Sequence, residues 1–97
     1  MTEKTGRSEI KVPGRKLIRV ECTIDGGVLR RIVITGDFFV HPEDGIQELE
    51  NELTSLEAKQ ETLRSHVLNF FKTGYDIVGA TPEDFAKAVL EAASQAS

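Results

Sequence analysis

The sequence has little of the material from which disulfides, metal sites and membrane anchors are made. Its 97 residues contain a single cysteine, Cys22, which excludes an internal disulfide and a metal site built from cysteines alone. No apolar run approaches the roughly 20 residues of a transmembrane helix. The N-terminal stretch MTEKTGRSEIKV also has no apolar signal-peptide region. We therefore expect a cytoplasmic protein without a membrane partner.

Aromatic residues are missing from the first third of the chain, because all five Phe and the single Tyr follow Gly36. Residues 1–36 carry eight Lys or Arg and four acids, a net charge of +4, whereas residues 37–97 carry four basic and twelve acidic residues, a net charge of −8. The basic segment could favour an anionic partner, or it could reflect only that Glu favours helices. Because nucleic-acid surfaces combine basic with aromatic side chains, we expect no nucleic-acid partner.

The first half of the sequence predicts strands. Residues 1–7 are polar, and we expect a disordered tail there. Residues 8–14 predict a short edge strand that ends at a proline. In residues 15–25, apolar positions alternate with polar ones, as in a half-buried strand: Ile18, Val20, Cys22 and Ile24. The glycines of Asp25-Gly26-Gly27 then predict a tight hairpin, with a return strand over residues 28–36.

The second half predicts helices. Pro42 and the two acids after it predict a helix start, and the apolar stripe that follows has helical spacing: Ile46, Leu49, Leu53 and Leu56. A second helix is expected over residues 59–72, closed by Gly74, followed by a connector over residues 75–80. The sequence TPED at residues 81–84 predicts the start of a third helix, with a loose tail at residues 95–97.

Strands followed by helices are typical of an α+β domain. We therefore expect a three-stranded antiparallel sheet with the helices packed on one face, as a single domain over residues 8–94. The other face of the sheet carries polar side chains and is either solvated or covered by a partner. Those side chains are Arg19, Glu21, Thr23, Arg31 and Thr35.

No set of residues in the sequence predicts catalysis or metal binding by this chain. Cys22 lies on the inward face of its predicted strand, where a free cysteine packs as a small apolar residue. His41 with Glu43 and Asp44 is the densest cluster of potential ligands, but it lacks a second His or Cys, and the start of a helix explains the same residues. We expect no catalytic residue and no metal ligand, so the chain is interpreted as an accessory module.

Several short motifs stand out over about residues 10–92: Pro13 to Leu17, Asp25 to Gly27, the strand Ile32 to Phe38 that ends in ITGDF, Pro42 with its helix, and Thr81 to Ala92. Together they resemble the C-terminal accessory domain of lipoate–protein ligase A. The lipoate-binding stretch of that family's large catalytic domain has no counterpart here. The resemblance therefore implies a stand-alone small subunit that forms a heterodimer with a large catalytic subunit.

In such a two-component ligase, the resemblance implies that the small subunit is needed for the ATP-dependent activation of lipoate to lipoyl-AMP. Transfer to lipoyl domains of acceptor proteins follows. Lipoate, ATP and Mg are expected to bind to the large subunit, and no cofactor is expected on this chain alone. Activity of this chain by itself is a further, disfavoured possibility.

The accessory domain also resembles iron–sulfur scaffold and SufE-type proteins in fold, a SufE/NifU-like arrangement. An iron–sulfur or sulfur-transfer binding protein is therefore the alternative function. Scaffold activity uses several cysteines, and this chain has only Cys22, which disfavours that alternative.

The residues expected to bind the large subunit form two groups: Arg15, Lys16 and Arg19 from the basic turn and strand, and the segment Gly36-Asp37-Phe38-Phe39. Consecutive residues of a strand point to opposite faces. We therefore expect one phenylalanine to enter the core and the other to anchor the partner. The alternative is that a bulge or twist buries both rings in this domain. Gly36 would allow a close approach of the partner's backbone.

Overall fold

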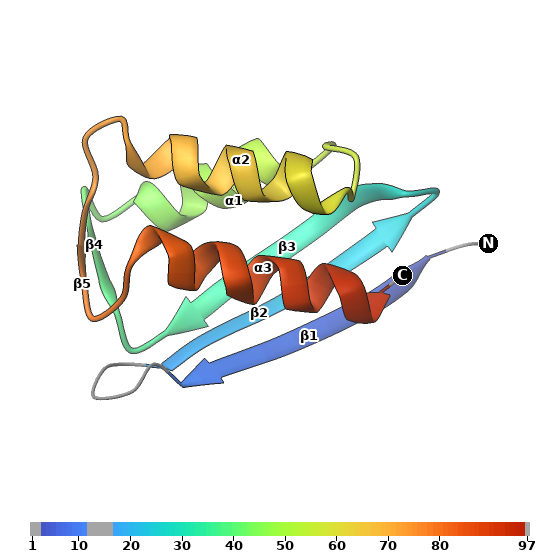
Figure 1. The fold of residues 1–97 in the computed structure, drawn as a ribbon, viewed down its shortest axis with the longest axis horizontal. Coiled ribbons are helices and arrows are strands. Elements are labelled where there is room, and N and C mark those ends of the chain that lie inside the picture. The colour runs from blue at the N-terminus through green and yellow to red at the C-terminus, as the bar shows by residue number, and fades with distance from the viewer. Residues whose placement is uncertain (1–2, 12–16, 97) are drawn as a thin grey trace.

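Three strands form the central sheet of this computed structural model, which describes residues 3–11 and 17–96. Strands β1 (Lys4–Lys11), β2 (Leu17–Asp25) and β3 (Val28–Gly36) pair antiparallel in the order β1-β2-β3 (Figure 1). The two-residue turn between β2 and β3 has positive φ angles at Gly26 and Gly27, 62° and 77°, as a type I′ hairpin requires. The predicted hairpin is therefore confirmed.

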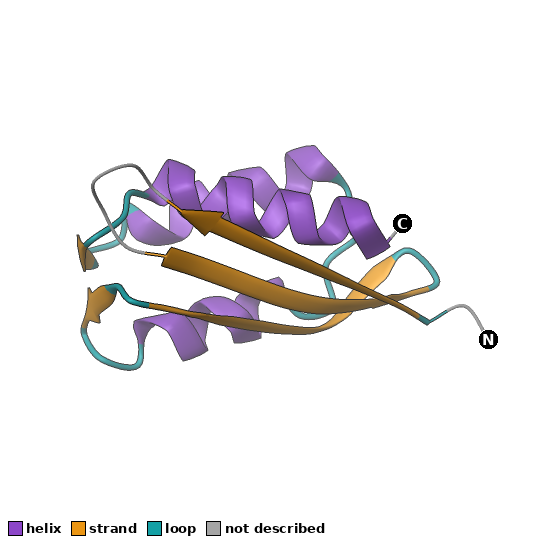
Figure 2. Ribbon diagram, turned by 90° about the horizontal axis from the view of Figure 1, so that it is seen from below, coloured by secondary structure: helices purple, strands orange, loops and turns teal. Residues whose placement is uncertain are grey.

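Three helices cover one face of this sheet. Helix α3 (Pro82–Ala96) packs on β1 and β2, α1 (Gly45–Leu53) packs along β3, and α2 (Gln60–Phe71) packs mainly on α3 (Figures 1 and 2). The alternating apolar residues of β2 are all buried beneath the helices: Ile18, Val20, Cys22 and Ile24. The predicted α+β class, with helices on one face of a three-stranded antiparallel sheet, is thus confirmed.

Helix α3 begins where the sequence predicts. The backbone N–H and the hydroxyl of Thr81 donate to Asp84 Oδ2 at 2.9 and 3.0 Å, and the Asp84 N–H donates to Thr81 Oγ1 at 3.3 Å. These reciprocal bonds satisfy donors that the first turn of a helix otherwise leaves without partners. The register of the helix is therefore set at its first turn.

The close contact between α3 and β1 depends on small residues. A Cβ atom added to Gly6 would lie 1.9 Å from the backbone oxygen of Ala92, so only glycine fits there. Two residues along the strand, Ser8 Oγ donates to the backbone oxygen of Ala88 at 2.6 Å. Because α3 faces the sheet with several buried alanines, the helix backbone approaches the strand directly.

Two expectations about the chain ends are corrected by this contact. The predicted disordered tail at residues 1–7 is wrong from Lys4 onward, because β1 begins there and Gly6 lies opposite Cys22 of β2 under α3. The predicted loose tail at residues 95–97 is also wrong as far as Ala96. That residue is 1% exposed and ends α3.

A second, two-stranded sheet was not expected. Strand β4 (Phe39–His41) pairs antiparallel with β5 (Asp76–Val78), inside the segment predicted to be a connector. Because the chain is still extended at His41, helix α1 begins at Gly45 rather than at Pro42. A Cβ on Gly45 would lie 2.7 Å from Val40 Cγ1, so α1 begins directly against β4.

The outer edge of β3 is covered by the chain itself. The Ile34 N–H donates to Glu50 Oε2 of α1 at 2.7 Å. Near the start of β3, the Leu29 N–H donates to the Leu56 oxygen at 2.9 Å, and the Ala58 N–H donates to the Gly27 oxygen at 2.8 Å. The Glu50 side chain of α1 and backbone groups after α1 thus occupy hydrogen-bonding positions that a sheet edge otherwise leaves open.

The contact between α3 and β1 is tested by replacing Gly6 with alanine. Because the added methyl group meets backbone atoms, we expect Gly6→Ala to lower the free energy of unfolding by about 1–3 kcal/mol, measured by urea denaturation. The control is Thr5→Ala, an exposed neighbour on the same strand, for which we expect a change within about 0.5 kcal/mol. Equal stabilities for the two variants would contradict the close contact.

Candidate partner-binding surface

The strand register brings the predicted partner-binding residues to one end of the sheet. Arg19 lies opposite Thr35, and Ile18 lies opposite Gly36. The chain then leaves the sheet through Asp37, whose N–H donates to the Leu17 oxygen at 3.0 Å. Arg19 therefore lies at the end of the sheet from which the segment Gly36 to Phe39 leaves, whereas Arg15 and Lys16 lie outside the described residues.

Gly36 is required by a contact inside this chain. A Cβ atom there would lie 2.0 Å from the Leu17 oxygen, so a side chain would push β2 and β3 apart. The close backbone approach that the glycine allows is thus between two strands of the same sheet. Its contact with a partner subunit stays a prediction.

The two adjacent phenylalanines point in different directions. The Phe38 ring packs edge to face on Phe85 of α3, with 4.7 Å between ring centroids and 85° between ring planes. Phe39 is 73% exposed. The expectation of one ring inside and one outside is therefore confirmed, and burial of both rings is wrong. That Phe39 anchors a partner stays a prediction.

Phe39 has an apolar neighbour that the sequence interpretation missed. Its partner across β4 and β5 is Val78, which is 65% exposed. The next cross-strand pair on the same face is His41 with Asp76, whereas the pair between them, Val40 and Ile77, points inward and packs against the core. The β-branched pair Ile77-Val78 was the available signal for β5, but a three-residue strand has too few positions to show alternation.

The ribbon formed by β4 and β5 is fixed to the helices through Tyr75. The Tyr75 ring stacks on Phe70 with 4.4 Å between centroids, and its hydroxyl donates to Glu48 of α1. That hydrogen bond, with smaller contributions from desolvation and the nearby carboxylates of Glu48, Asp44 and Glu52, raises the pKa of Tyr75 to about 12. Stacked aromatic rings therefore connect the ribbon to the helices, and carboxylates lie close to the Tyr75 hydroxyl.

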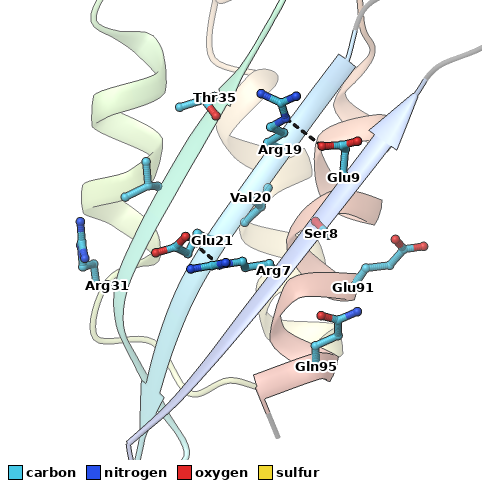
Figure 3. A pocket seen from close by; sticks show the side chains of 11 residues that line it. Arg7, Ser8, Glu9, Arg19, Val20, Glu21, Arg31, Thr35, Glu91 and Gln95 are labelled. Atoms are coloured by element: carbon cyan, nitrogen blue, oxygen red, sulfur yellow. Dashed lines mark hydrogen bonds and ion pairs between the residues drawn. The ribbon is translucent and has the colours of Figure 1, made fainter.

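The open face of the sheet carries paired charges (Figure 3). Arg7 lies 2.9 Å from Glu21, and Arg19 lies 2.8 Å from Glu9, each pair directly across β1 and β2. With Arg31 and other side chains, these groups line a shallow hollow of about 700 Å³. Exposed pairs of this kind contribute at most about 1 kcal/mol each, so they add little to the stability of the sheet. Arg19 remains exposed beside Glu9.

Cys22 is held in the core. It is 2% exposed, and burial raises the pKa of its thiol, which disfavours the reactive thiolate. Across residues 3–11 and 17–96, no group of three or more His, Cys, Asp or Glu residues could hold a metal ion, the cluster around His41 included. No helix in the same part of the chain has the length and hydropathy to cross a membrane.

The fold and this surface define a small domain of the α+β class: a sheet covered by helices on one side, with an exposed apolar pair at one end. Comparison with known proteins identifies the family. A profile described as "Bacterial lipoate protein ligase C-terminus" matches residues 17–89, and the chain belongs to this family.

Two comparisons find matches in Thermoplasma acidophilum. The chain is 40% identical over 73 residues to lipoate-protein ligase A subunit 2, covering 75% of this chain and 76% of the relative. It also matches a chain from a structural analysis of an archaeal lipoylation system, described as a bipartite lipoate protein ligase and its E2 lipoyl domain. That match has a TM-score of 0.81 and 33% identity, and covers 90% of this chain and 96% of the other.

The burial of Cys22 predicts that its thiol is unreactive in the native protein. We expect a colorimetric thiol reagent to react at least about 100-fold more slowly with the native chain than with the chain in guanidinium chloride, because reaction requires opening of the core. The unfolded chain is the control, since it contains the same single thiol. Equal rates in the two states would restore the sulfur-transfer alternative.

Proposed function

We propose that this chain is the small subunit of a two-component lipoate–protein ligase. In this proposal it binds the large catalytic subunit and is required for the ATP-dependent activation of lipoate to lipoyl-AMP. Transfer of the lipoyl group to lipoyl domains follows. Lipoate, ATP and Mg bind to the large subunit, and the small subunit acts by completing that site.

The observation that carries the proposal is the match to a ligase subunit over most of both chains. The relative named as subunit 2 is matched over 76% of its length, and the chain from the bipartite ligase structure over 96% of its length. Each matched chain is therefore itself a small polypeptide of similar length to this one. Together with family membership, they favour a subunit role over an unrelated use of the same fold.

The chemistry of adenylation explains why a second subunit would help. The lipoate carboxylate attacks the α-phosphorus of ATP, the bond to the bridging oxygen breaks, and pyrophosphate leaves. Negative charge gathers at one place during this step, and the product hydrolyses readily if water enters. A small domain that closes on the large subunit would exclude water and order the groups that bind the nucleotide.

The described residues that are proposed to make this contact lie at one end of the sheet. Phe39 would supply an apolar anchor, and Arg19 a charge that orients the encounter. Arg15 and Lys16, outside the described residues, belong to the same proposal, as do Gly36, Asp37 and Phe38 through their position on the segment that presents Phe39. The sulfur-transfer alternative has less support, because it needs an accessible thiol and Cys22 is buried.

The subunit role is tested by reconstitution with the catalytic subunit from the same organism. Formation of lipoyl-AMP is followed by release of pyrophosphate from ATP. We expect no turnover by this chain alone, and a rate at least about tenfold higher for both subunits than for the large subunit alone, because water exclusion and ordering act on the adenylation step. An equal rate without this chain, or turnover by this chain alone, would contradict the proposal.

The orienting role of Arg19 is tested by charge reversal. We expect Arg19→Glu to slow association with the large subunit about three- to tenfold at low ionic strength, and less at high ionic strength, because long-range attraction sets the association rate. The matched control is Arg7→Glu, which breaks an equivalent exposed pair farther from Gly36. Equal rates for the two variants would place the contact elsewhere.

A further inference from the structure

The two large apolar side chains that are most exposed in the described chain lie together. Phe39 and Val78 are direct cross-strand partners, 73% and 65% exposed. They share the outward face of the β4–β5 ribbon with His41 and Asp76, and these four residues are called the ribbon patch from here on. The patch lies at the end of the molecule away from the two termini (Figure 1).

The apolar pair is not needed to hold the ribbon in place. The inward residues Val40 and Ile77 pack against the core, and Tyr75 binds the base of the ribbon to Phe70 and Glu48. Substitutions of Phe39 or Val78 therefore remove little buried contact within this chain. Their apolar character contributes free energy only when another surface covers them.

Acidic side chains lie at the end of the ribbon that is next to α1. Asp76 belongs to the patch itself, Glu48 accepts the hydrogen bond of the Tyr75 hydroxyl, and the carboxylates of Asp44 and Glu52 also lie near Tyr75. A two-fold contact between copies of this chain would bring these carboxylates together, because each surface in such an interface meets itself. Repulsion between these like charges disfavours a second copy of this chain as the partner that covers the patch. A surface with cationic side chains around an apolar cleft is complementary instead.

We propose that the ribbon patch enters an apolar cleft of the catalytic ligase subunit, with Phe39 and Val78 as joint anchors and with cationic side chains of the cleft opposite Asp76 and the acids of α1. This inference rests on the proposed function, and it adds Val78 and Asp76 to the contact. The partner surface is thereby expected to be an apolar cleft with cationic side chains at its rim. Arg19, on the sheet side of the ribbon, would lie at the opposite rim of the same contact.

The inference is tested by measuring the dissociation constant of the complex with the large subunit. We expect Phe39→Ala to raise it at least about tenfold and Val78→Ala about threefold or more, as for buried interface anchors. Because the two side chains touch the same cleft, the double variant should lose less than the product of the single effects. Val33→Ala, on the open face of the sheet, is the matched control, and we expect a change below about twofold.

The charge of the cleft is tested separately with Asp76→Lys. We expect this reversal to slow association about three- to tenfold at low ionic strength and to lose most of its effect at high ionic strength. Thermal unfolding of every variant shows whether it keeps the wild-type fold. An unchanged association rate for a folded Asp76→Lys variant would contradict the proposal that the cleft of the large subunit carries cationic side chains.

The outcomes separate this inference from the proposed function. If the wild-type chain does not bind the large subunit, the proposed function is wrong. If it binds and the folded double variant Phe39→Ala, Val78→Ala binds within about twofold of wild type, the ribbon patch is not the anchor. If the double variant instead changes the oligomeric state of the isolated chain, measured by light scattering, the patch joins copies of this chain and the inference is overturned.

Discussion

The contact of α3 with the first two strands determines most of what this chain presents to its surroundings. Gly6 allows the helix backbone to lie directly on β1, which fixes the position of α3 over the sheet. Phe85 of that helix is fully buried and receives the ring of Phe38. Phe38 directly precedes β4, so its contact with Phe85 ties the start of this strand to α3. The first residue of the strand, Phe39, is left on the outward face of the ribbon.

Features that depend on local pattern could be predicted from the sequence. The alternation in β2, the two glycines of the hairpin and the Thr81-to-Asp84 helix start each contain their signal within a few residues. The inward and outward phenylalanines could also be predicted from the alternation of sides along an extended chain, although Phe38 lies just before β4 and not within it. These features gave the fold class and most of the proposed contact segment.

Features that depend on distant partners could not be predicted in the same way. Strand β5 has three residues and forms only because β4 lies beside it; for that reason Val78 was assigned to a connector. The strand conformation of Lys4 to Arg7 depends on β2 and on the space beneath α3, although the residues themselves are polar. The start of α1 moved to Gly45 because β4 keeps the preceding residues extended. In each case a tertiary contact overrode the local preference.

The covered edge of β3 has a consequence for how the protein behaves at high concentration. Glu50 and the segment after α1 take up backbone groups along that edge, so a strand from a neighbouring molecule finds few free donors or acceptors there. Growth of a continuous intermolecular sheet needs two open edges on every molecule, one to receive and one to offer. With one edge of the central sheet closed, stacking through that sheet stops after a single addition, which disfavours fibres built from its strands.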